Sequence, residues 1–515
     1  MPPPTSNAEM QKTTAAELPE VSLAYGAGPE VKIDVAAIPE LQNGAEDEEY
    51  QGLEVIFDPG ISSKHRRKSS ISHSNSQSLP KIGSSSCFVH ALLEAQKAAE
   101  AGKTFAEFDS QLHKNEELRV GPSMDSRMLT KMQLTDLALG VRELSKRFAS
   151  MELRLKVRNF FLVTKPHDNS LLRYTRELAL WLLKHSQDSV VYVDQNIRER
   201  QEFDAMCILS EPSFENRLRY WTPEICLKHP HTFDFVITVS LTVIKGAVFG
   251  HGSYQQLGGD GTVLYASWLF QKIVPPVLSF ALGSLGFLTT FDFKDFPRSI
   301  EHCLNDGITV CLRLRFEGTI MRSLKRERRQ RTEECDLIRE ILGMEADGPT
   351  HRGAESFTIL NEVVVDRGPN STMSSTELFG DNEHLTSILA DGICISTPTG
   401  STAYSLAAGG SLCHPEIPSM LVTPICAHSL TFRPLILPDS MVLRVGVPYD
   451  ARTSVWASFD GRQRLELCQG DYITVSASRF PFPAIQSRKQ NKDWFNSLSR
   501  NFHWGTRQKQ KPYNE

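Results

Sequence analysis

The sequence predicts an α/β domain followed by an all-β domain, preceded by a long disordered tail. Strand-like and helix-like segments alternate between about 160 and 283, which is typical of a parallel sheet with helices on both faces. Short strand-like runs separated by turns follow from 301 to 480. Residues 1–125 are rich in Pro, Ser, Glu and Gly and contain few long apolar runs, which is typical of disorder.

The α/β domain is predicted over 126–300. It begins with helical apolar spacing near 128 and then alternates strands with helices. Pro166, Asp168 and Asn169 mark the turn between the first strand and the first long helix. The predicted strands are Phe160–Thr164, Val190–Asp194, Phe233–Thr238 and one within Pro275–Gly283, and the helix after the first strand covers about 170–185.

The all-β domain is predicted over 301–480, beginning with ITVCLRLRFEGTI. A charged stretch from Arg322 to Glu355 interrupts its strands, and we expect this stretch to protrude from a hairpin as a mobile loop. Residues 481–515 contain Trp494, Phe502 and Trp504, which we expect to anchor this tail against the body of the protein or against a partner subunit.

Composition and charge limit the class of protein. The 515 residues suffice for two or three domains, and 40% hydrophobic with 23% charged residues is ordinary for a soluble globular protein. A net charge of −5 offers no general attraction for nucleic acid. We expect no membrane span, because the longest apolar runs are far short of the roughly 20 residues that cross a bilayer. The ten scattered cysteines lack metal-ligand spacing, which favours a reducing compartment, by default the cytosol, and predicts no protein-bound metal.

The glycine turn LGGDGT, Leu257–Thr262, is the first candidate for chemistry. Glycines let backbone N–H groups approach a phosphate closely, and the helical spacing after the turn adds a helix N-terminus, which favours anions. The carboxylate of Asp260 in such a turn costs repulsion and therefore needs a function. Two are open from the residues alone: it accepts a proton from an attacking hydroxyl, or it helps to hold a magnesium ion.

Two further stretches combine small and polar residues. Ala390–Pro415 runs from a strand, Ile393–Ser396, through the turn TPTGST into a small-residue helix, Ala403–Ala408. Small residues allow close approach of a flat or phosphorylated ligand and the hydroxyls supply donors, although a tight turn against a packed helix is the alternative. Asn361 and Glu362 open a Val-rich strand, where polar side chains are poor core and suit hydrogen bonding to a sugar or a base.

Together these stretches resemble the NAD kinase family, whose members use ATP to phosphorylate the 2′-hydroxyl of the adenosine ribose of NAD. The resemblance runs from about Phe160 to Gln510, includes LGGDGTVLYASWLF, LNEVVVDRGP, STPTGSTAYSLAAGG and SFDGR, and looks like the eukaryotic branch, particularly its cytosolic fungal members. It implies a Rossmann-like α/β domain and a β-sandwich-like, NAD-binding domain with the site between them. It also implies ATP and NAD as substrates, Mg²⁺ arriving with ATP, and a cytoplasmic homo-oligomer.

The resemblance implies a role for each matching residue. Asp260 would be the general base that takes the proton of the ribose hydroxyl. Gly259 and Gly261 would bind phosphate through their amides, and Asn361 and Glu362 would hold the nucleoside of NAD. The other residues implied to bind the dinucleotide are Gly258, Thr262, Asp391, Gly392, Thr402, Ala403, Tyr404, Ser405 and Asp460.

Two other functions stay open at this stage. A lipid kinase could share the GGDGT turn, and it would need a deep apolar pocket and membrane attachment. A non-catalytic regulator could bind the dinucleotide without transferring phosphate. Assays with NAD against lipid substrates, and of NADP binding against turnover, separate the three functions.

One segment departs from the family pattern, in which a strand leads directly into the glycine turn. Here Val239–Gln256 stands between the strand Phe233–Thr238 and the turn, and removing it makes FDFVITLGGDGT continuous. The segment begins with Val-Ser and ends with Gln, residues whose codons can supply the borders of a spliceosomal intron. We hypothesise that it is a retained intron, with a lineage-specific loop as the alternative.

Overall fold

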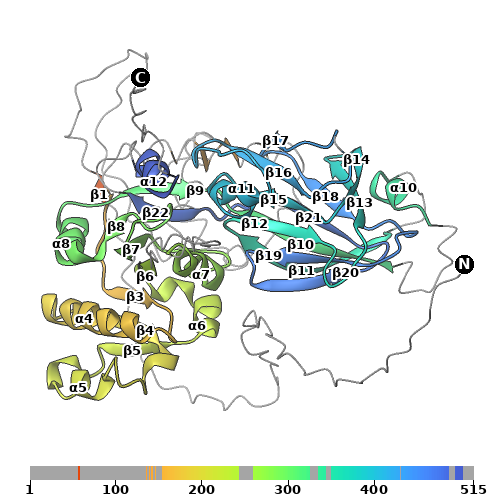
Figure 1. Ribbon diagram of the computed structural model, residues 1–515. Coiled ribbons are helices and arrows are strands. Elements are labelled where there is room, and N and C mark those ends of the chain that lie inside the picture. Colours follow the sequence, from red (N-terminus) through yellow and green to blue (C-terminus); the bar gives the residue numbers. More distant parts are fainter. Residues whose placement is uncertain are drawn as a thin grey trace, which may run out of the picture. The chain divides into compact units, whose positions relative to one another are not determined.

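The computed structural model describes residues 56–57, scattered positions between 135 and 145, and residues 153–242, 259–324, 335–343, 349–429, 431–486 and 493–502. The predicted disordered tail, 1–125, lies outside these ranges apart from strand β1 (Ile56–Phe57), which pairs antiparallel with β2 (Leu153–Arg154). The described elements form an α/β domain with a mainly parallel sheet and an all-β domain, which confirms the predicted fold class (Figure 1).

The sheet of the α/β domain has the strand order β5-β4-β3-β6-β7-β22-β9, with β8 beside β7, and its neighbours from β5 to β22 run parallel. β3 is buried on both faces, as parallel strands usually are: Phe160 and Leu162 enter one core cluster, and Phe161 and Val163 enter another. The strands are β3 (Asn159–Val163), β4 (Val190–Asp194), β5 (Leu218–Trp221), β6 (Phe235–Thr242), β7 (Val277–Gly283), β8 (Phe291–Asp292), β9 (Thr309–Arg313) and β22 (Phe482–Gln486).

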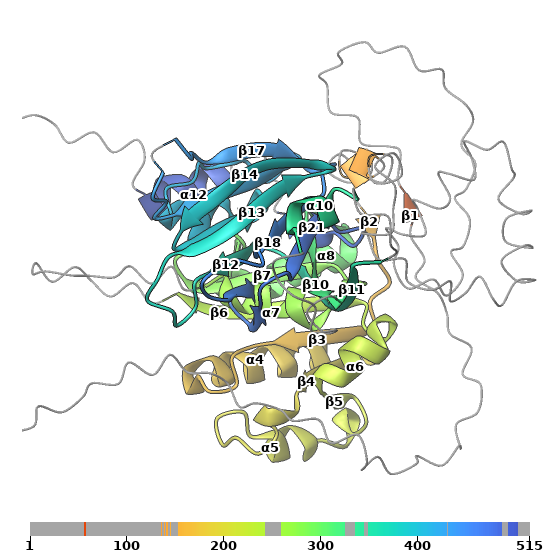
Figure 2. The ribbon, with the colours of Figure 1, turned by 90° about the vertical axis from the view of Figure 1, so that its right-hand side faces the viewer.

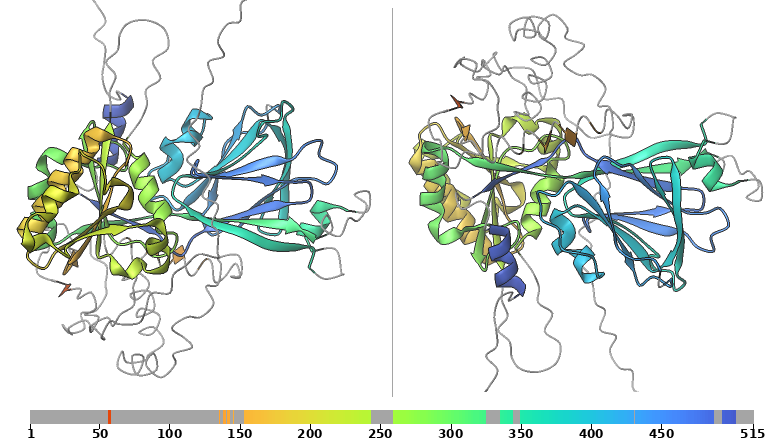
Figure 3. Two further views of the ribbon diagram at one scale, coloured as in Figure 1. Left: turned by 90° about the horizontal axis from the view of Figure 1, so that it is seen from below. Right: turned by 90° about the horizontal axis from the view of Figure 1, so that it is seen from above.

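Helices cover both faces of this sheet (Figure 3). Helix α4 begins after Asp168, whose carboxylate accepts hydrogen bonds from the N–H groups of Ser170 and Leu171. α4, α5 and α8 contribute to the core cluster on one face, and α6 and α7 contribute to the cluster on the other. The helices of this domain are α4 (Asn169–His185), α5 (Ala205–Leu209), α6 (Pro223–Lys228), α7 (Gly261–Leu269), α8 (Phe296–Asn305) and α12 (Asp493–Phe502).

Two strands differ from the sequence prediction. β6 continues past Thr238 to Thr242, into the inserted segment, because Val239 is completely buried in the core and the strand stays paired with β7. Residues 243–258, the rest of the insert with the start of the glycine turn, lie outside the described ranges. β9, which the sequence assigned to the all-β domain, pairs antiparallel with β22 in the α/β sheet. An apolar pattern shows that a strand is buried, but not which sheet it joins.

The all-β domain consists of two sheets that share one hydrophobic core (Figure 2). Phe316, Leu378 and Val475 reach this core from one sheet, and Val363 and Phe459 reach it from the other. The first sheet has the order β11 (His351–Ile359), β10 (Phe316–Ser323), β21 (Tyr472–Ala477), β18 (Leu443–Gly446), β13 (Ser374–Gly380), β14 (Glu383–Ala390); the second has the order β17 (Leu435–Pro438), β16 (Ser419–Ile425), β15 (Gly392–Ser396), β12 (Glu362–Asp366), β19 (Val455–Phe459), β20 (Gln463–Leu467).

The charged stretch 322–355 covers the end of β10, the connection 324–350 and the start of β11, and the two strands pair antiparallel as a hairpin. Part of the stretch packs on the domain instead of protruding. Helix α10 (Leu337–Ile341) buries Leu337, and its Glu340 accepts a hydrogen bond from the Tyr449 hydroxyl at 3.0 Å. Residues 325–334 and 344–348 of the stretch lie outside the described ranges.

Arg315 anchors α7 at the point where the chain passes from one domain into the other. Its guanidinium is completely buried and donates to the carbonyl oxygens of Ser267 (3.2 Å), Phe270 (2.8 Å), Lys272 (2.8 Å) and Phe480 (2.7 Å). The first three carbonyls lie at the C-terminal end of α7, where a cation also complements the helix dipole. The start of β10 and helix α7 are therefore held together, and with them the glycine turn at the other end of α7.

Candidate active site

The carboxylate of Asp260 is held by the loop that follows β7. Its Oδ2 accepts a hydrogen bond from the Phe287 N–H (3.0 Å), and its Oδ1 accepts from the N–H groups of Leu288 (3.0 Å) and Thr289 (3.2 Å) and from the Thr289 hydroxyl (3.2 Å). Gly286 permits this approach, because a Cβ at that position would lie 2.3 Å from Oδ1. The described part of the glycine turn, residues 259–262, is thus held by its own acidic side chain.

The electrostatic setting of Asp260 suits proton transfer. Burial raises the pKa of the Asp260 carboxyl above its ordinary value, and the hydrogen bonds from residues 287–289 oppose that shift. A carboxylate with a raised pKa is a stronger base than an exposed aspartate. Within the described part of the chain Oδ2 accepts one hydrogen bond, so it retains a lone pair for a substrate hydroxyl.

The N-terminal end of α7 is open toward a ligand. Asp260 does not cap the helix, since its side chain is turned toward the loop 286–289. The hydroxyl of Thr262 is buried and has no hydrogen-bond partner among the residues that the structure describes. A Cβ on Gly261 would meet no atom within 4 Å. Buried polar atoms nearly always have partners, and helix N-termini favour anions, so this end of α7 can receive a phosphate or a sugar hydroxyl.

Asn361 and Glu362, at the start of β12, are positioned by Asp460. The carboxylate of Asp460 accepts hydrogen bonds from three successive N–H groups, those of Leu360 (2.8 Å), Asn361 (2.9 Å) and Glu362 (3.0 Å). Asp460 has a φ of 48°, an unusual conformation for a residue with a side chain, in the turn between β19 and β20. Oδ1 of Asn361 and Oε2 of Glu362 are buried without a hydrogen-bond partner in the described structure, so a ligand can satisfy both.

The β19–β20 turn also reaches the glycine turn. Arg462 donates a hydrogen bond to the carbonyl oxygen of Gly261 at 3.4 Å, and its guanidinium lies 4.6 Å from the ring centroid of Tyr265 on α7. The β19–β20 turn therefore contacts both the polar start of β12 and the N-terminal turn of α7. It thereby brings the N-terminal turn of α7, which carries Thr262, near the start of β12, which carries Asn361 and Glu362.

The TPTGST turn holds the backbone of Asn361 through hydrogen bonds to carbonyl oxygens. It consists of a short 3₁₀ helix, Thr399–Thr402, followed by α11 (Tyr404–Ala407). Thr397 donates through its N–H to the carbonyl of Asn361 (2.8 Å) and through its hydroxyl to that of Leu360 (2.6 Å). Gly400 is required here, because a Cβ would lie 2.4 Å from the Asn361 carbonyl oxygen. The turn therefore contacts the Asn361 backbone through its own backbone and hydroxyl groups.

Of the other residues predicted to bind the dinucleotide, three lie in the turn beside Glu362 and one is buried in the core of the domain. The side chain of Tyr404 is 44% exposed beside Glu362, with which the Tyr404 backbone forms a hydrogen bond, and Thr402 and Ala403 precede it in the same turn. The hydroxyl of Ser405 is buried and bonded to that of Thr423 (3.0 Å), which gives it a role in packing. Gly258 lies outside the described ranges.

Asp391 and Gly392 are not brought to Asn361 and Glu362 within one chain. β12 and β15 are antiparallel with Glu362 opposite Ser396, so Gly392 is four residues further along, on the order of 14 Å away. The absence of a side chain at Gly392 is explained by the neighbouring strand, since a Cβ there would lie 2.6 Å from the Val365 carbonyl oxygen.

The pKa of the Glu362 carboxyl is raised far above the ordinary value of a glutamate. Burial, together with the nearby carboxylate of Asp460, raises the pKa of Glu362 to about 8, and a hydrogen bond involving the Tyr404 backbone opposes the shift. A neutral carboxyl carries one O–H donor as well as acceptors. Glu362 can therefore donate a hydrogen bond to a ligand oxygen, or lose its proton when a ligand donor approaches.

Glu362 should make the stability of the protein depend on pH. The unfolded chain releases this proton near 4.5 and the folded protein near 8, so the folded state binds more protons between those values. The contribution of Glu362 to the free energy of unfolding is therefore lost as pH rises through this window. We expect Glu362→Gln to unfold at the same temperature as the wild type near pH 5 and at a higher temperature near pH 8.

Thermal melts across this pH range test the prediction, with Glu199→Gln, on an exposed glutamate, as the control for loss of one carboxylate. If the unfolding temperatures of the wild type and of Glu362→Gln changed with pH in the same way, the raised pKa of Glu362 would be contradicted.

Sequence reasoning missed two groups of residues at this site. The loop Gly286–Thr289 belongs to GSLGFLT, a motif that is visible in the sequence but whose contact with Asp260 needs the fold. The second is Arg462, which contacts the Gly261 carbonyl. It directly follows the Asp-Gly of SFDGR, and a cation next to such a tight turn was the feature in the sequence that could have indicated it.

The fold and the site define a two-domain protein, an α/β domain followed by a β sandwich, with a buried carboxylate beside a helix N-terminus. Two family models match: the N-terminal domain of ATP-NAD kinases over residues 256–308, and their C-terminal domain over residues 360–487. The first match begins at Gln256, the last residue of the inserted segment.

Relatives extend the match over most of the chain. An uncharacterized kinase of Schizosaccharomyces pombe is 43% identical over 374 residues, 72% of this chain and 86% of that protein. An NAD(+) kinase of Saccharomyces cerevisiae is 42% identical over 385 residues, 75% and 67% of the two chains. The solved structure of a yeast NADH kinase in complex with NADH superposes with a TM-score of 0.53 at 25% identity, over 70% of this chain and 93% of that one. This chain belongs to the ATP-NAD kinase family.

Proposed function

We propose that this protein transfers the γ-phosphoryl group of ATP to the 2′-hydroxyl of the adenosine ribose of NAD, giving NADP. Kinase activity toward NAD follows from the family; the particular hydroxyl and the roles of individual residues are the proposal. The observation that carries it is the Asp260 carboxylate, held by three N–H groups beside a helix N-terminus whose buried Thr262 hydroxyl is unpaired in the described structure.

In the proposed reaction Asp260 takes the proton of the ribose hydroxyl as that oxygen attacks the γ-phosphorus. The hydroxyl has a pKa far above 7, so a positioned base typically contributes roughly 10²–10⁴-fold. Asn361 and Glu362 hold the dinucleotide through their unpaired buried oxygens. Asp460 acts as a positioning residue, because its carboxylate already accepts three backbone hydrogen bonds. Alignment of the two substrates supplies much of the remaining rate.

Mg²⁺ is proposed to enter with ATP. In the described part of the chain, no group of three or more His, Cys, Asp or Glu side chains is arranged to hold a metal ion. The triphosphate would supply most of the ligands, as is usual for Mg²⁺, and the ion would neutralise charge that develops on the phosphates.

A coupled assay of NADP formation with ATP, Mg²⁺ and NAD tests the function. NADH in place of NAD tests the acceptor that two of the yeast relatives are named for. Sphingoid bases and diacylglycerol test the lipid-kinase alternative, which none of the comparisons favours. Tight NADP binding without turnover would identify a regulator instead of an enzyme.

Replacing Gly261 by Ala separates ligand contact from protein stability. The added Cβ meets no protein atom within 4 Å, so we expect the unfolding temperature to stay the same or rise slightly. A phosphate against the Gly261 amide would be displaced, and kcat/KM should fall roughly tenfold or more, because one charge-assisted hydrogen bond contributes about 1.5–3 kcal/mol. Melts and steady-state kinetics on one preparation measure both effects. Unchanged kinetics would place the phosphate elsewhere.

We further propose that the protein acts in the cytoplasm as a homo-oligomer. Exposed apolar side chains on two edge strands support self-association: Leu385 (40% exposed) and Leu389 (43%) on β14, and Ile436 (58%) on β17. None of the described helices is long and apolar enough to cross a membrane. Light scattering after size exclusion measures the oligomeric state.

A further inference from the structure

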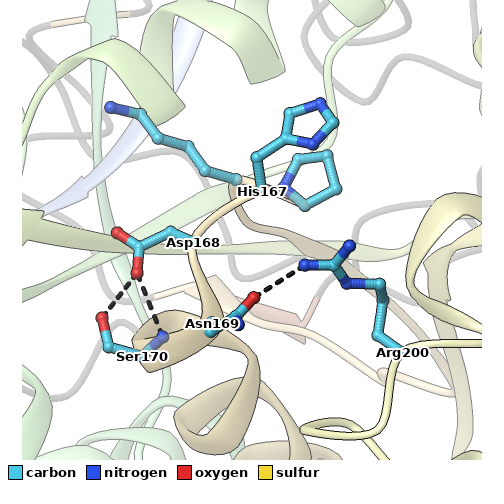
Figure 4. A pocket seen from close by; sticks show the side chains of 7 residues that line it. His167, Asp168, Asn169, Ser170 and Arg200 are labelled. Atoms are coloured by element: carbon cyan, nitrogen blue, oxygen red, sulfur yellow. Dashed lines mark hydrogen bonds between the residues drawn. The ribbon is translucent and has the colours of Figure 1, made fainter.

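The C-terminal helix α12 packs beside the candidate active site, and the proposed function has given it no role. Asp493 and Trp494 of this helix line a small cavity of about 30 Å³, together with residues of β9, β22 and the loop after β7. The open pocket of about 740 Å³ at the start of α4 is a separate hollow with none of these residues in its lining (Figure 4). The cavity thus marks where α12 meets the loop that holds Asp260.

Ser497 joins α12 to that loop. Its side chain is completely buried, and its hydroxyl donates to the carbonyl oxygen of Gly286 at 2.8 Å. The same hydroxyl oxygen accepts a hydrogen bond from Arg500 at 3.1 Å, which leaves its hydrogen for the Gly286 carbonyl. The three residues after Gly286 are those whose N–H groups donate to the Asp260 carboxylate. A single hydroxyl therefore anchors the loop that positions the predicted base.

Apolar side chains of α12 reinforce the anchor. Leu498 is buried, and the ring of Phe502 lies against that of Phe287, with 5.8 Å between the ring centroids. The N–H group of Phe287 donates to Oδ2 of Asp260, the oxygen that retains a lone pair for a substrate hydroxyl. The helix therefore contacts the residue that orients this oxygen.

The first turn of α12 contacts the all-β domain. The rings of Trp494 and His414 meet edge to face, with 5.1 Å between their centroids. His414 follows Cys413, whose N–H donates to the hydroxyl of Ser401 at 3.0 Å while its carbonyl accepts from that hydroxyl at 3.1 Å. Ser401 lies in the TPTGST turn, which holds the backbone of Asn361. One helix thus connects the loop that holds Asp260 with the turn that holds Asn361.

The electrostatic setting of Asp260 depends on the same loop. Burial raises the pKa of the Asp260 carboxyl, and the hydrogen bonds from residues 287–289 oppose the shift. If the loop moved away, these hydrogen bonds would weaken and the pKa of Asp260 would rise further. Displacement of the loop would therefore alter the ionisation of the carboxylate as well as its place.

We propose that α12 is a positioning element for phosphoryl transfer, in which Ser497 fixes Asp260 through the loop 286–289 and Trp494 fixes the helix to the TPTGST turn. The inference rests on the proposed function. Neither side chain has to touch a substrate, because each acts through the segment that it contacts. In the wild-type protein the anchor holds the loop in place, so its loss should cost activity; it would help only where the loop is strained.

The first test is Ser497→Ala, which leaves the Gly286 carbonyl without its donor. We expect kcat with NAD to fall roughly three- to tenfold while calorimetry shows NADP binding unchanged. The acid limb of the kcat–pH profile should move to higher pH, because a base with a higher pKa stays protonated to a higher pH. A loss of stability alone would lower the unfolding temperature without moving this limb.

Ser323→Ala is the matched control. It removes an equally buried hydroxyl, which is bonded to that of Tyr449 at 2.7 Å at the end of β10. We expect a lower unfolding temperature, an unchanged kcat and an unchanged acid limb. A Ser497→Ala protein with the same profile as this control would overturn the positioning role.

Trp494 tests the other end of the helix and serves also if Ser497→Ala does not fold. Trp494→Leu removes the aromatic contact with His414 and should lower kcat roughly threefold or more, whereas Trp494→Phe keeps a ring there and should stay within about twofold of the wild type. Equal turnover of Trp494→Leu and the wild type would contradict the link between α12 and the TPTGST turn.

Amide hydrogen exchange separates this inference from the proposed function. In Ser497→Ala the N–H groups of residues 287–289 should exchange faster than in the wild type, whether or not the protein turns over NAD. Unchanged exchange would show that α12 does not hold the loop. A wild-type protein without NAD kinase activity would instead refute the proposed function.

Discussion

Replacing Asp260 by Asn is expected to lower kcat with NAD by roughly 10²–10⁴-fold, the usual contribution of a positioned general base. The amide cannot take the ribose proton. Its NH₂ group would also be forced toward one of the backbone N–H donors of residues 287–289, all of which need an acceptor. Steady-state kinetics, NADP binding and thermal melts together separate the loss of the base from displacement of the loop.

Thr289→Val is the matched control for Asp260→Asn. It removes the hydroxyl that donates to Asp260 Oδ1 and keeps the carboxylate with its three N–H partners. We expect its loss of kcat to stay within about tenfold, because the carboxylate keeps its three N–H donors. The Gly286 N–H, which also donates to the Thr289 hydroxyl (2.9 Å), keeps the Thr289 carbonyl as an acceptor (3.1 Å). If Thr289→Val were as damaging as Asp260→Asn, loop placement and not proton transfer would explain both. Full turnover of Asp260→Asn would show that another group is the base.

Replacing Gly286 by Ala is expected to cost roughly 10²-fold in kcat/KM, the loss that a displacement of about 1 Å produces at a reacting group. The new Cβ would lie 2.3 Å from Asp260 Oδ1 and 2.7 Å from the Thr289 hydroxyl. The backbone of Gly286 cannot easily yield, because its N–H donates to the Thr289 carbonyl (3.1 Å) and its carbonyl accepts from the Ser497 hydroxyl on α12 (2.8 Å). The carboxylate must therefore move.

This variant alters the position of the base without altering its chemistry. A loss in Gly286→Ala with NADP binding retained would show that the orientation of Asp260, and not merely its presence, sets the rate. Ser497→Ala frees the Gly286 carbonyl, so combining the two substitutions should recover part of the activity if strain at residue 286 is the cause. Wild-type turnover in Gly286→Ala would mean that the loop and the carboxylate separate during the reaction.

Local sequence patterns predicted an element correctly where its structure depends on residues within that segment. The predicted strand Val190–Asp194 coincides with β4, and the helix predicted over about 170–185 corresponds to α4 because Asp168 caps it and its leucines share one face. Local patterns failed where the structure of an element depends on a partner from a distant part of the chain. β9 entered the α/β sheet because β22, from the other end of the chain, pairs with it.

The candidate site shows the same division. The motifs and the resemblance pointed to Asp260, Asn361 and Glu362. The β19–β20 turn links the two stretches that carry them, because its Asp460 holds the backbone of residues 360–362 and its Arg462 contacts Gly261. Asp460 was expected to bind the dinucleotide, but its carboxylate holds the backbone of residues 360–362, a contact across about a hundred residues that spacing cannot reveal.

By itself the sequence determined the family, the order of strands and helices, and the kinds of side chain available for chemistry, since these depend on residues close together in the chain. Only the tertiary structure decided which oxygen is free to take a proton and which carboxylates are used up in holding the backbone. Hydrogen bonds and burial set those outcomes, and both are made by residues from distant parts of the chain.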